Sequence, residues 1–165
     1  MPMNGAALLP EFDHEIENTR KMLALAPDEC LDYRPHEKSW TLRQLATHVA
    51  NLPTWTGPTF HMDELDLAQP FEPWIPENTD EILAAFDKAA SEARLVLESA
   101  SADTFLEPWT LKAGDQIHFT MPKGVVFRSF VLNHLIHHRA QLGVYLRMCD
   151  IAIPGMYGPS ADETM

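Results

Sequence analysis

The sequence predicts an all-α protein, a four-helix bundle with a small β-hairpin before the last helix. Apolar residues recur at steps of three and four in four long segments, and this spacing gives a helix one apolar face. Proline and glycine fall mainly between these segments, and one short stretch alternates polar and apolar residues as a strand does. The chain has no internal repeat, and its 165 residues can bury one sizeable core, so we expect one domain over residues 1–165.

The first predicted helix covers residues 9–25 and stops before Pro27, because proline has no amide hydrogen with which to continue a helix. The second helix begins at Thr41. Thr41 and Gln44 have the spacing of a capping box, in which two side chains satisfy free amides at a helix start. The stripes that face the core are Phe12, Ile16, Thr19 and Leu23 in the first helix, and Leu45, His48 and Leu52 in the second.

The chain beyond the second helix is interrupted before it becomes helical again. Pro53 is expected to kink or break the second helix, and residues 60–67 are expected to form a further short turn of helix. A connection with prolines at positions 70, 73 and 76 follows. Asn78 is the expected N-cap of a third helix over residues 79–99, because an asparagine side chain accepts a hydrogen bond from a free amide at a helix start.

The last part of the chain predicts the hairpin and the fourth helix. Residues 109–121 alternate polar and apolar side chains on both sides of Ala113-Gly114-Asp115, which is typical of a hairpin turn. The fourth helix is predicted over residues 123–148. Its inward stripe includes His134 and His138, at positions where a core would otherwise hold leucine.

The charge of the chain argues against nucleic acid and membranes as partners. The formal net charge is −12, and such a protein repels phosphate backbones. No apolar run approaches the roughly 18 residues that a membrane span needs. The first ten residues carry no positive charge and lack the layout of a secretory signal. We therefore expect a cytoplasmic protein, in which Cys30 and Cys149 are reduced thiols.

Three histidines are candidate metal ligands. His134 and His138 are four residues apart on a helix and therefore face the same way, and His48 lies on the apolar stripe of another helix. Three imidazoles in one bundle core can hold one divalent metal ion, and they leave a coordination position open, as in catalytic zinc sites. In the alternative, the three rings satisfy one another through hydrogen bonds and buried water, without a metal.

The neighbours of these histidines have expected roles as well. His137 is expected to be rotated away from the ligands, where it supports one of them or lies at an interface, and Arg139 is expected to point further out. Gln141 and Tyr145 follow on the ligand stripe and can line the open side of the ion. The other isolated histidines are expected at the surface; they are His14, His36, His61 and His118.

Two known metal schemes do not fit this sequence. The HExxH motif of zinc peptidases is absent, because Leu135 follows His134. A di-iron carboxylate bundle needs two Glu-x-x-His motifs, and only Glu11 and His14 have that spacing. The spacing of the acidic residues therefore identifies no general base and no catalytic residue.

Three motifs resemble the DinB and YfiT-like metalloenzyme family. They are Ser39-Trp40-Thr41 ahead of His48, the segment Asn133-His134-Leu-Ile-His137-His138-Arg139-Ala-Gln141-Leu, and the tail with Tyr157-Gly158-Pro159-Ser160. The resemblance implies a bundle of up-down-down-up order, with a long connection between the second and third helices, and often a homodimer. It also implies one divalent metal ion, nickel or zinc, bound by His48, His134 and His138.

Some members of that family are thiol transferases or isomerases that use low-molecular-weight thiols, and many have no known activity. The resemblance therefore predicts a metal-dependent enzyme in which the ion lowers the pKa of a bound thiol or water. Thiol transfer to a small molecule is the first choice and hydrolysis the second. The alternative function is a non-catalytic metal-binding or stress-response bundle.

Overall fold

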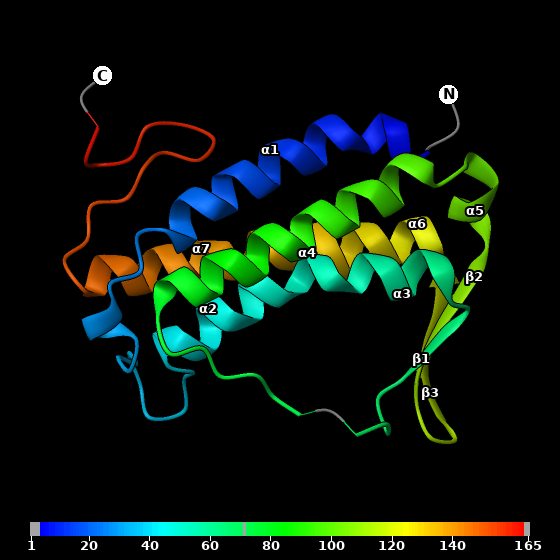
Figure 1. Ribbon diagram of the computed structural model, residues 1–165, viewed down its shortest axis with the longest axis horizontal. Coiled ribbons are helices and arrows are strands. Elements are labelled where there is room, and N and C mark those ends of the chain that lie inside the picture. The colour runs from blue at the N-terminus through cyan, green and yellow to red at the C-terminus, as the bar shows by residue number, and fades with distance from the viewer. Residues whose placement is uncertain (1–3, 71, 164–165) are drawn as a thin grey trace.

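The computed structural model describes residues 4–70 and 72–163, which are mostly helical with one small sheet (Figure 1). The long helices α1 (Gly5–Leu23), α2 (Leu42–Asn51), α4 (Thr79–Ser99) and α7 (His134–Met148) lie side by side. Helices α1 and α2 each pack against both α4 and α7. Within these two stretches, every helix falls short of the length or the apolar content that a membrane span requires.

Helix α1 begins at Gly5, earlier than the predicted start at residue 9. The side chain of Asn4 caps it by accepting a hydrogen bond from the amide of Ala7, at 2.9 Å. The prediction missed this turn because the apolar stripe begins later than the cap. A 3₁₀ turn, η1 (Asp28–Cys30), follows the helix in the loop that leads to α2.

The predicted capping box of α2 is confirmed. The hydroxyl of Thr41 accepts from the amide of Gln44, and the Gln44 side chain accepts from the amide of Thr41, at 2.9 Å. The predicted break at Pro53 is also present, because the chain tightens into a 3₁₀ turn, η2 (Leu52–Trp55), before α3 (Thr56–His61).

The prediction of a helical turn over residues 60–67 is wrong for most of that segment. Helix α3 ends at His61, and Glu64–Asp66 form strand β1, which pairs in parallel with β2 (Pro108–Ala113). Strand β1 forms because it pairs with β2, which lies far along the chain. The amide of Thr110 donates to the carbonyl of Asp63, at 2.9 Å. The short segment itself carries no strong strand pattern, so its local sequence could not reveal the pairing.

Helix α4 and the hairpin are confirmed. The side chain of Asn78 accepts from the amide of Glu81 at 3.0 Å and caps α4. Strands β2 and β3 (Gln116–Pro122) pair in antiparallel orientation, and Gly114 in the turn has a φ of 58°. Glycine adopts this left-handed conformation without strain. A short helix, α5 (Ala102–Leu106), connects α4 to the sheet and was not predicted.

The predicted fourth helix has the expected extent but is not uniform. It comprises α6 (Lys123–Val126), a π-helical segment η3 (Phe127–Asn133) and α7. In a π-helix the hydrogen bonds reach one residue further than in an α-helix, and such segments are frequent at functional sites. Here the π segment lies directly before His134.

The prediction that Arg139 points outward is wrong. Only 2% of Arg139 is exposed, and its guanidinium contacts the carboxylate of Glu15 on α1, at 2.7 Å. The guanidinium also donates to the hydroxyl of Tyr157, at 2.6 Å. Arg139 faces inward because α7 is covered by α1 as well as by α2, and a buried charge needs a partner.

The C-terminal tail is held against α1 and α7 by polar contacts. The hydroxyl of Tyr157 donates to the carboxylate of Glu15 at 2.7 Å, and Arg147 forms an ion pair with Asp162. Asp162 also accepts from the amide of Ile153, at 2.9 Å. The tail motif of the sequence therefore has a visible structural role, which is to bind the tail to the helices.

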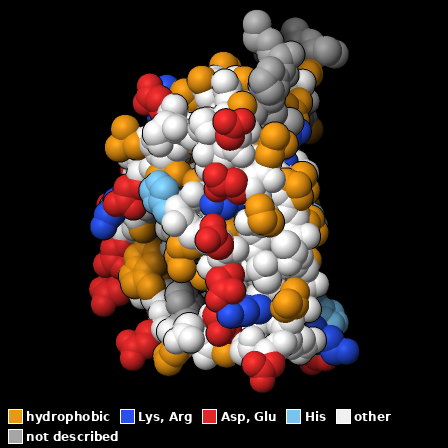
Figure 2. Space-filling view, turned by 90° about the vertical axis from the view of Figure 1, so that its right-hand side faces the viewer, with side chains coloured by type: hydrophobic (Ala, Val, Ile, Leu, Met, Phe, Trp, Pro, Cys, Tyr) orange, Lys and Arg blue, Asp and Glu red, His pale blue; other side chains and the backbone are white. Residues whose placement is uncertain are grey.

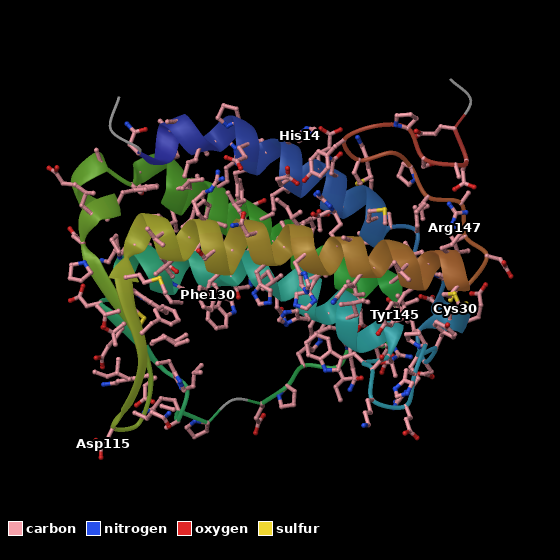
Figure 3. The ribbon with its side chains drawn as sticks, turned by 180° about the vertical axis from the view of Figure 1, so that it is seen from behind. His14, Cys30, Asp115, Phe130, Tyr145 and Arg147 are labelled. Atoms are coloured by element: carbon pink, nitrogen blue, oxygen red, sulfur yellow. The ribbon has the colours of Figure 1, made fainter. Side chains whose placement is uncertain are left out.

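The acidic composition is visible on the molecular surface. Asp and Glu side chains run down the face at the sheet end of the molecule (Figure 2). The four histidines expected at the surface are exposed. Cys30 and Cys149 are free thiols, as expected. Cys30 lies near the end of α7 that carries Arg147, far from Asp115 at the hairpin tip (Figure 3).

The buried ion pair generates a prediction about stability. Replacing Arg139→Leu leaves the Glu15 carboxylate buried without its cation, so we expect a loss of about 3–5 kcal/mol in the free energy of unfolding. The matched control is Arg94→Leu, which breaks the exposed pair of Arg94 with Asp13 and should cost less than about 1 kcal/mol. Urea unfolding measures both, and equal losses would contradict the prediction.

Candidate metal centre

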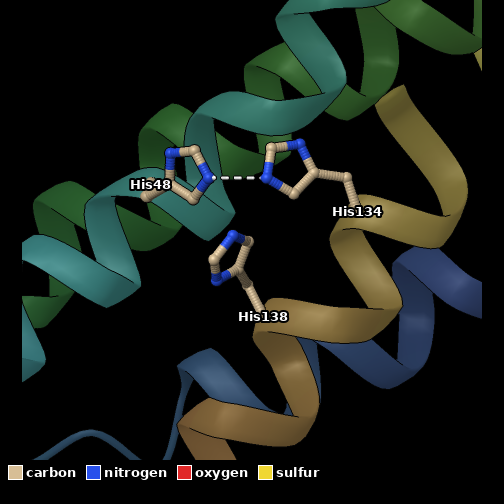
Figure 4. A group of neighbouring side chains, drawn as sticks. All are labelled: His48, His134 and His138. Atoms are coloured by element: carbon tan, nitrogen blue, oxygen red, sulfur yellow. Dashed lines mark hydrogen bonds between the residues drawn. The ribbon is translucent and has the colours of Figure 1, made fainter. Parts of the chain in front are cut away.

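Three histidines from two helices converge in the bundle (Figure 4). His48 projects from α2, and His134 and His138 project from the first two turns of α7. The Nε2 atoms of His48 and His134 are 3.2 Å apart, and one ring nitrogen from each of the three lies within 4.8 Å of the others. The structure thus brings together the three residues that the sequence predicts as ligands.

The spacing of these nitrogens suits a shared ion. Two nitrogens bound about 2.0–2.1 Å from one zinc ion, at angles of about 90–109°, lie roughly 2.9–3.4 Å apart. The 3.2 Å between His48 and His134 falls within that range. No Asp or Glu of the described residues joins the cluster, so the donor set is imidazole alone. Imidazole suits zinc, nickel, copper and iron, and the three residues can hold such an ion.

Burial keeps the three rings neutral near pH 7. It lowers the pKa of His48 to about 4, with smaller contributions from the neighbouring rings of His138 and His134. Burial likewise lowers the pKa of His134 and of His138. Only a neutral imidazole has a lone pair to offer a metal, so the site does not have to lose protons before it binds an ion.

The π segment helps to orient His134. The amide of His134 donates to the carbonyl of Val131, three residues earlier, at the junction of the π segment and α7. From this backbone position the ring points toward α2, and its Nε2 faces His48 (Figure 4). The Nε2 atom of His134 is therefore the one that would bind an ion shared with His48.

Gln141 gives His138 a comparable support. Its Oε1 accepts a hydrogen bond from Nδ1 of His138 at 2.7 Å, which leaves Nε2 of that ring free for a metal. Its Nε2 donates to His137, at 3.2 Å. His137 is exposed and rotated away from the cluster, as expected. From the sequence, Gln141 was expected at the open side of the ion; its contact with His138 was not predicted, although residues three and four apart on a helix are neighbours.

Trp40 covers the cluster on one side. Its indole ring lies 5.0 Å from the ring of His48 and 5.7 Å from that of His138, measured between ring centres. The hydroxyl of Tyr145 donates to the backbone carbonyl of Trp40, at 3.1 Å, and so ties this residue to α7. Tyr145 therefore positions the residue that covers the ligands.

An open cleft of about 440 Å³ begins at His138 and extends along the loop that precedes α2. Trp40, Gln141 and Tyr145 are among the residues that line it. A second cleft of about 440 Å³ lies between another face of α7 and the C-terminal tail, and none of the three histidines lines it. The first cleft is therefore the one through which a small molecule can approach the histidine cluster.

The sequence profile of the DinB family matches residues 1–164, nearly the whole chain. The chain belongs to the DinB family. A relative from Bacillus subtilis (strain 168), the uncharacterized protein YrdA, is 29% identical over 157 residues. The match covers 94% of this chain and 89% of YrdA. The family that the sequence motifs resemble is thus confirmed.

Two solved structures of DinB-like proteins share the fold. A protein from Bacillus cereus ATCC 10987 aligns with a TM-score of 0.74 at 22% identity, over 95% of this chain and 100% of that one. The YjoA protein of Bacillus subtilis aligns with a TM-score of 0.71 at 14% identity, over 91% and 96%. At 22% and 14% identity, the similarity to these two proteins shows a shared fold alone.

The contact between Gln141 and His138 predicts an effect on metal affinity. Gln141→Met keeps the size of the side chain but removes the acceptor for Nδ1, so we expect the Kd for zinc to rise about tenfold. Competition with a chromophoric chelator measures this Kd. Gln116→Met in strand β3 is the control, since Gln116 is exposed and far from the cluster. An unchanged Kd in Gln141→Met would refute the orienting role.

The lowered pKa of His48 predicts a pH effect on the metal-free protein. Between its ordinary value of 6.5 and about 4, the unfolded chain binds a proton at His48 that the folded chain does not. The free energy of unfolding should therefore fall as the pH falls through this window. In His48→Gln the fall should be smaller, and in the exposed control His118→Gln unchanged. Urea unfolding of chelator-treated protein tests this, and identical pH slopes would disprove it.

Proposed function

We propose that this DinB-family protein is a metal-dependent enzyme that binds one divalent ion, nickel or zinc, through His48, His134 and His138. Thiol transfer to a small-molecule electrophile is the leading reaction, with a low-molecular-weight thiol as co-substrate, and hydrolysis is the second. The observation that supports the proposal is the convergence of three neutral imidazoles, with no fourth protein ligand among the described residues. Three protein ligands leave room for a reactant, as catalytic zinc sites do.

A divalent cation at these nitrogens would lower the pKa of a thiol or water bound to it and so supply a nucleophile at neutral pH. The chain's own residues prepare the site. The Gln141 side chain holds His138 with Nδ1 protonated and Nε2 free. Trp40 excludes water from one side of His48 and His138, which strengthens electrostatic interactions there.

A non-catalytic metal-binding role is the second candidate, and one observation favours it. The three ligands come from α2 and α7, which pack against each other, so a shared ion would also lock these two helices together. In this role a stress-response protein would gain stability from the ion without turning over a substrate. It differs from the enzyme in one measurable respect, the consumption of a substrate.

Several broader properties complete the proposal, and they rest on the family and the composition. We propose one domain over residues 1–165, helices in up-down-down-up order, a homodimer and a cytoplasmic location. The long connection between α3 and α4 supports the helix order, because it allows the third long helix to run alongside the second in the same direction. The net charge of −12 supports a partner other than nucleic acid.

Elemental analysis of the purified protein tests the metal site. We expect about one ion per chain in the parent and a loss of most of it in His48→Ala and in His134→Ala. His118→Ala is the matched control, because His118 is exposed on β3 and should leave the metal content unchanged. Absence of metal after incubation with zinc and nickel would refute the proposal and leave a hydrogen-bonded histidine core.

The reaction is tested on the metal-loaded protein. Steady consumption of an electrophile that requires both the ion and an added thiol would support thiol transfer. Consumption of an ester without thiol would support hydrolysis. A large fall of Tm on chelation, without turnover in either assay, would decide for the non-catalytic role.

A further inference from the structure

The basic side chains of this acidic protein are mostly paired with carboxylates. Within residues 4–70 and 72–163, nine of the twelve Lys and Arg side chains lie within 4.0 Å of an Asp or Glu oxygen. The three that do not are Arg34, Lys38 and Lys88. Two of these three, Arg34 and Lys38, belong to the loop that precedes α2. Unpaired cations therefore gather in one loop, on a protein whose net charge is −12.

That loop forms one wall of the cleft at His138. Lys38 and Trp40 line the cleft from the loop, and Val144 and Tyr145 line it from α7. No Asp or Glu of the described chain is among the lining residues. Its volume of about 440 Å³ lies within the roughly 300–1,000 Å³ range of small-molecule sites. The cleft thus combines an aromatic face, an aliphatic wall and a cation with no partner.

We propose that this cleft binds a small organic anion with an apolar body, and that this anion is the substrate of the metal centre. The inference rests on the proposed function. The anionic group lies at the ammonium of Lys38, and the body packs on the indole of Trp40, a residue that is 45% exposed. The far end of the molecule then reaches His138, where the cleft meets the ligand cluster.

In the described part of the chain, the cleft between α7 and the C-terminal tail has no unpaired cation, so it is less suited to an anion than the cleft at His138. Its lining is largely apolar, and its two cations already have partners: Arg139 contacts Glu15, and Arg147 contacts Asp162. An anion placed there would compete with carboxylates already bound to those guanidinium groups. At Lys38 no carboxylate of the described residues lies within ion-pair distance, so an anion placed there meets no such competitor.

Calorimetric titration of the zinc-loaded protein with 2-naphthoate tests the proposal, and the neutral 2-naphthamide serves as the uncharged analogue. We expect naphthoate to bind more tightly than naphthamide. Lys38→Gln should weaken naphthoate about three- to tenfold and leave naphthamide unchanged, as expected for one charge-assisted contact near the surface. The matched control is Lys88→Gln, since Lys88 is also exposed and unpaired among the described residues.

The aromatic face is tested in the same titration. Trp40→Leu should weaken both ligands, because both lose the indole surface. Trp74→Leu should weaken neither, since Trp74 is exposed to a similar degree, 40%, but lies outside the cleft. The proposal is overturned if naphthoate does not bind, if naphthamide binds equally well, or if Lys38→Gln leaves the Kd for naphthoate unchanged.

The metal content of the same samples separates this proposal from the proposed function. Naphthoate binding that depends on Lys38, in a protein that takes up no metal, would refute the metal centre and retain the anion cleft. A protein with one ion per chain whose naphthoate affinity is insensitive to Lys38→Gln would retain the metal centre and refute the cleft. In that case the carboxylate would be binding the ion directly.

Discussion

The buried ion pair between Arg139 on α7 and Glu15 on α1 fixes the rotation of α7, and the histidine site depends on that rotation. Adjacent residues on a helix point about 100° apart. Once Arg139 is turned toward α1, His138 is therefore turned toward α2 and meets His48. Tyr157 contacts both members of the pair, so the C-terminal tail supports the same orientation from outside.

The parts of the fold that the sequence predicted depend on local signals. Helix α4 follows its asparagine cap, α2 follows its capping box, and the hairpin follows from alternation around Gly114. Strand β1 was missed because it exists only through pairing with β2, far along the chain. The π segment was missed because its side-chain pattern is close to that of an ordinary helix, and the difference lies in backbone hydrogen bonds.

In the candidate site, too, some features could be predicted from the sequence and others could not. The three histidines were predictable because they interrupt apolar stripes. Burying an imidazole there costs free energy unless the ring has a partner. Their supports were not predictable. The contact of Gln141 with His138 depends on a side-chain rotamer, and the cover that Trp40 gives the rings depends on the path of the loop before α2. The outward placement of Arg139 was wrong because the sequence does not show that a second helix covers that side of α7.

The π segment η3 has a consequence for the rotation of α7. A π turn accommodates one surplus residue within a wider turn of the backbone. With α6 anchored, the same residues wound as an ordinary α-helix would turn everything downstream by about 100°. His134 and His138 would then leave the interior, and Arg139 would lose Glu15. The ligand geometry and the charge pairing of α7 thus depend on the same wide turn of the backbone.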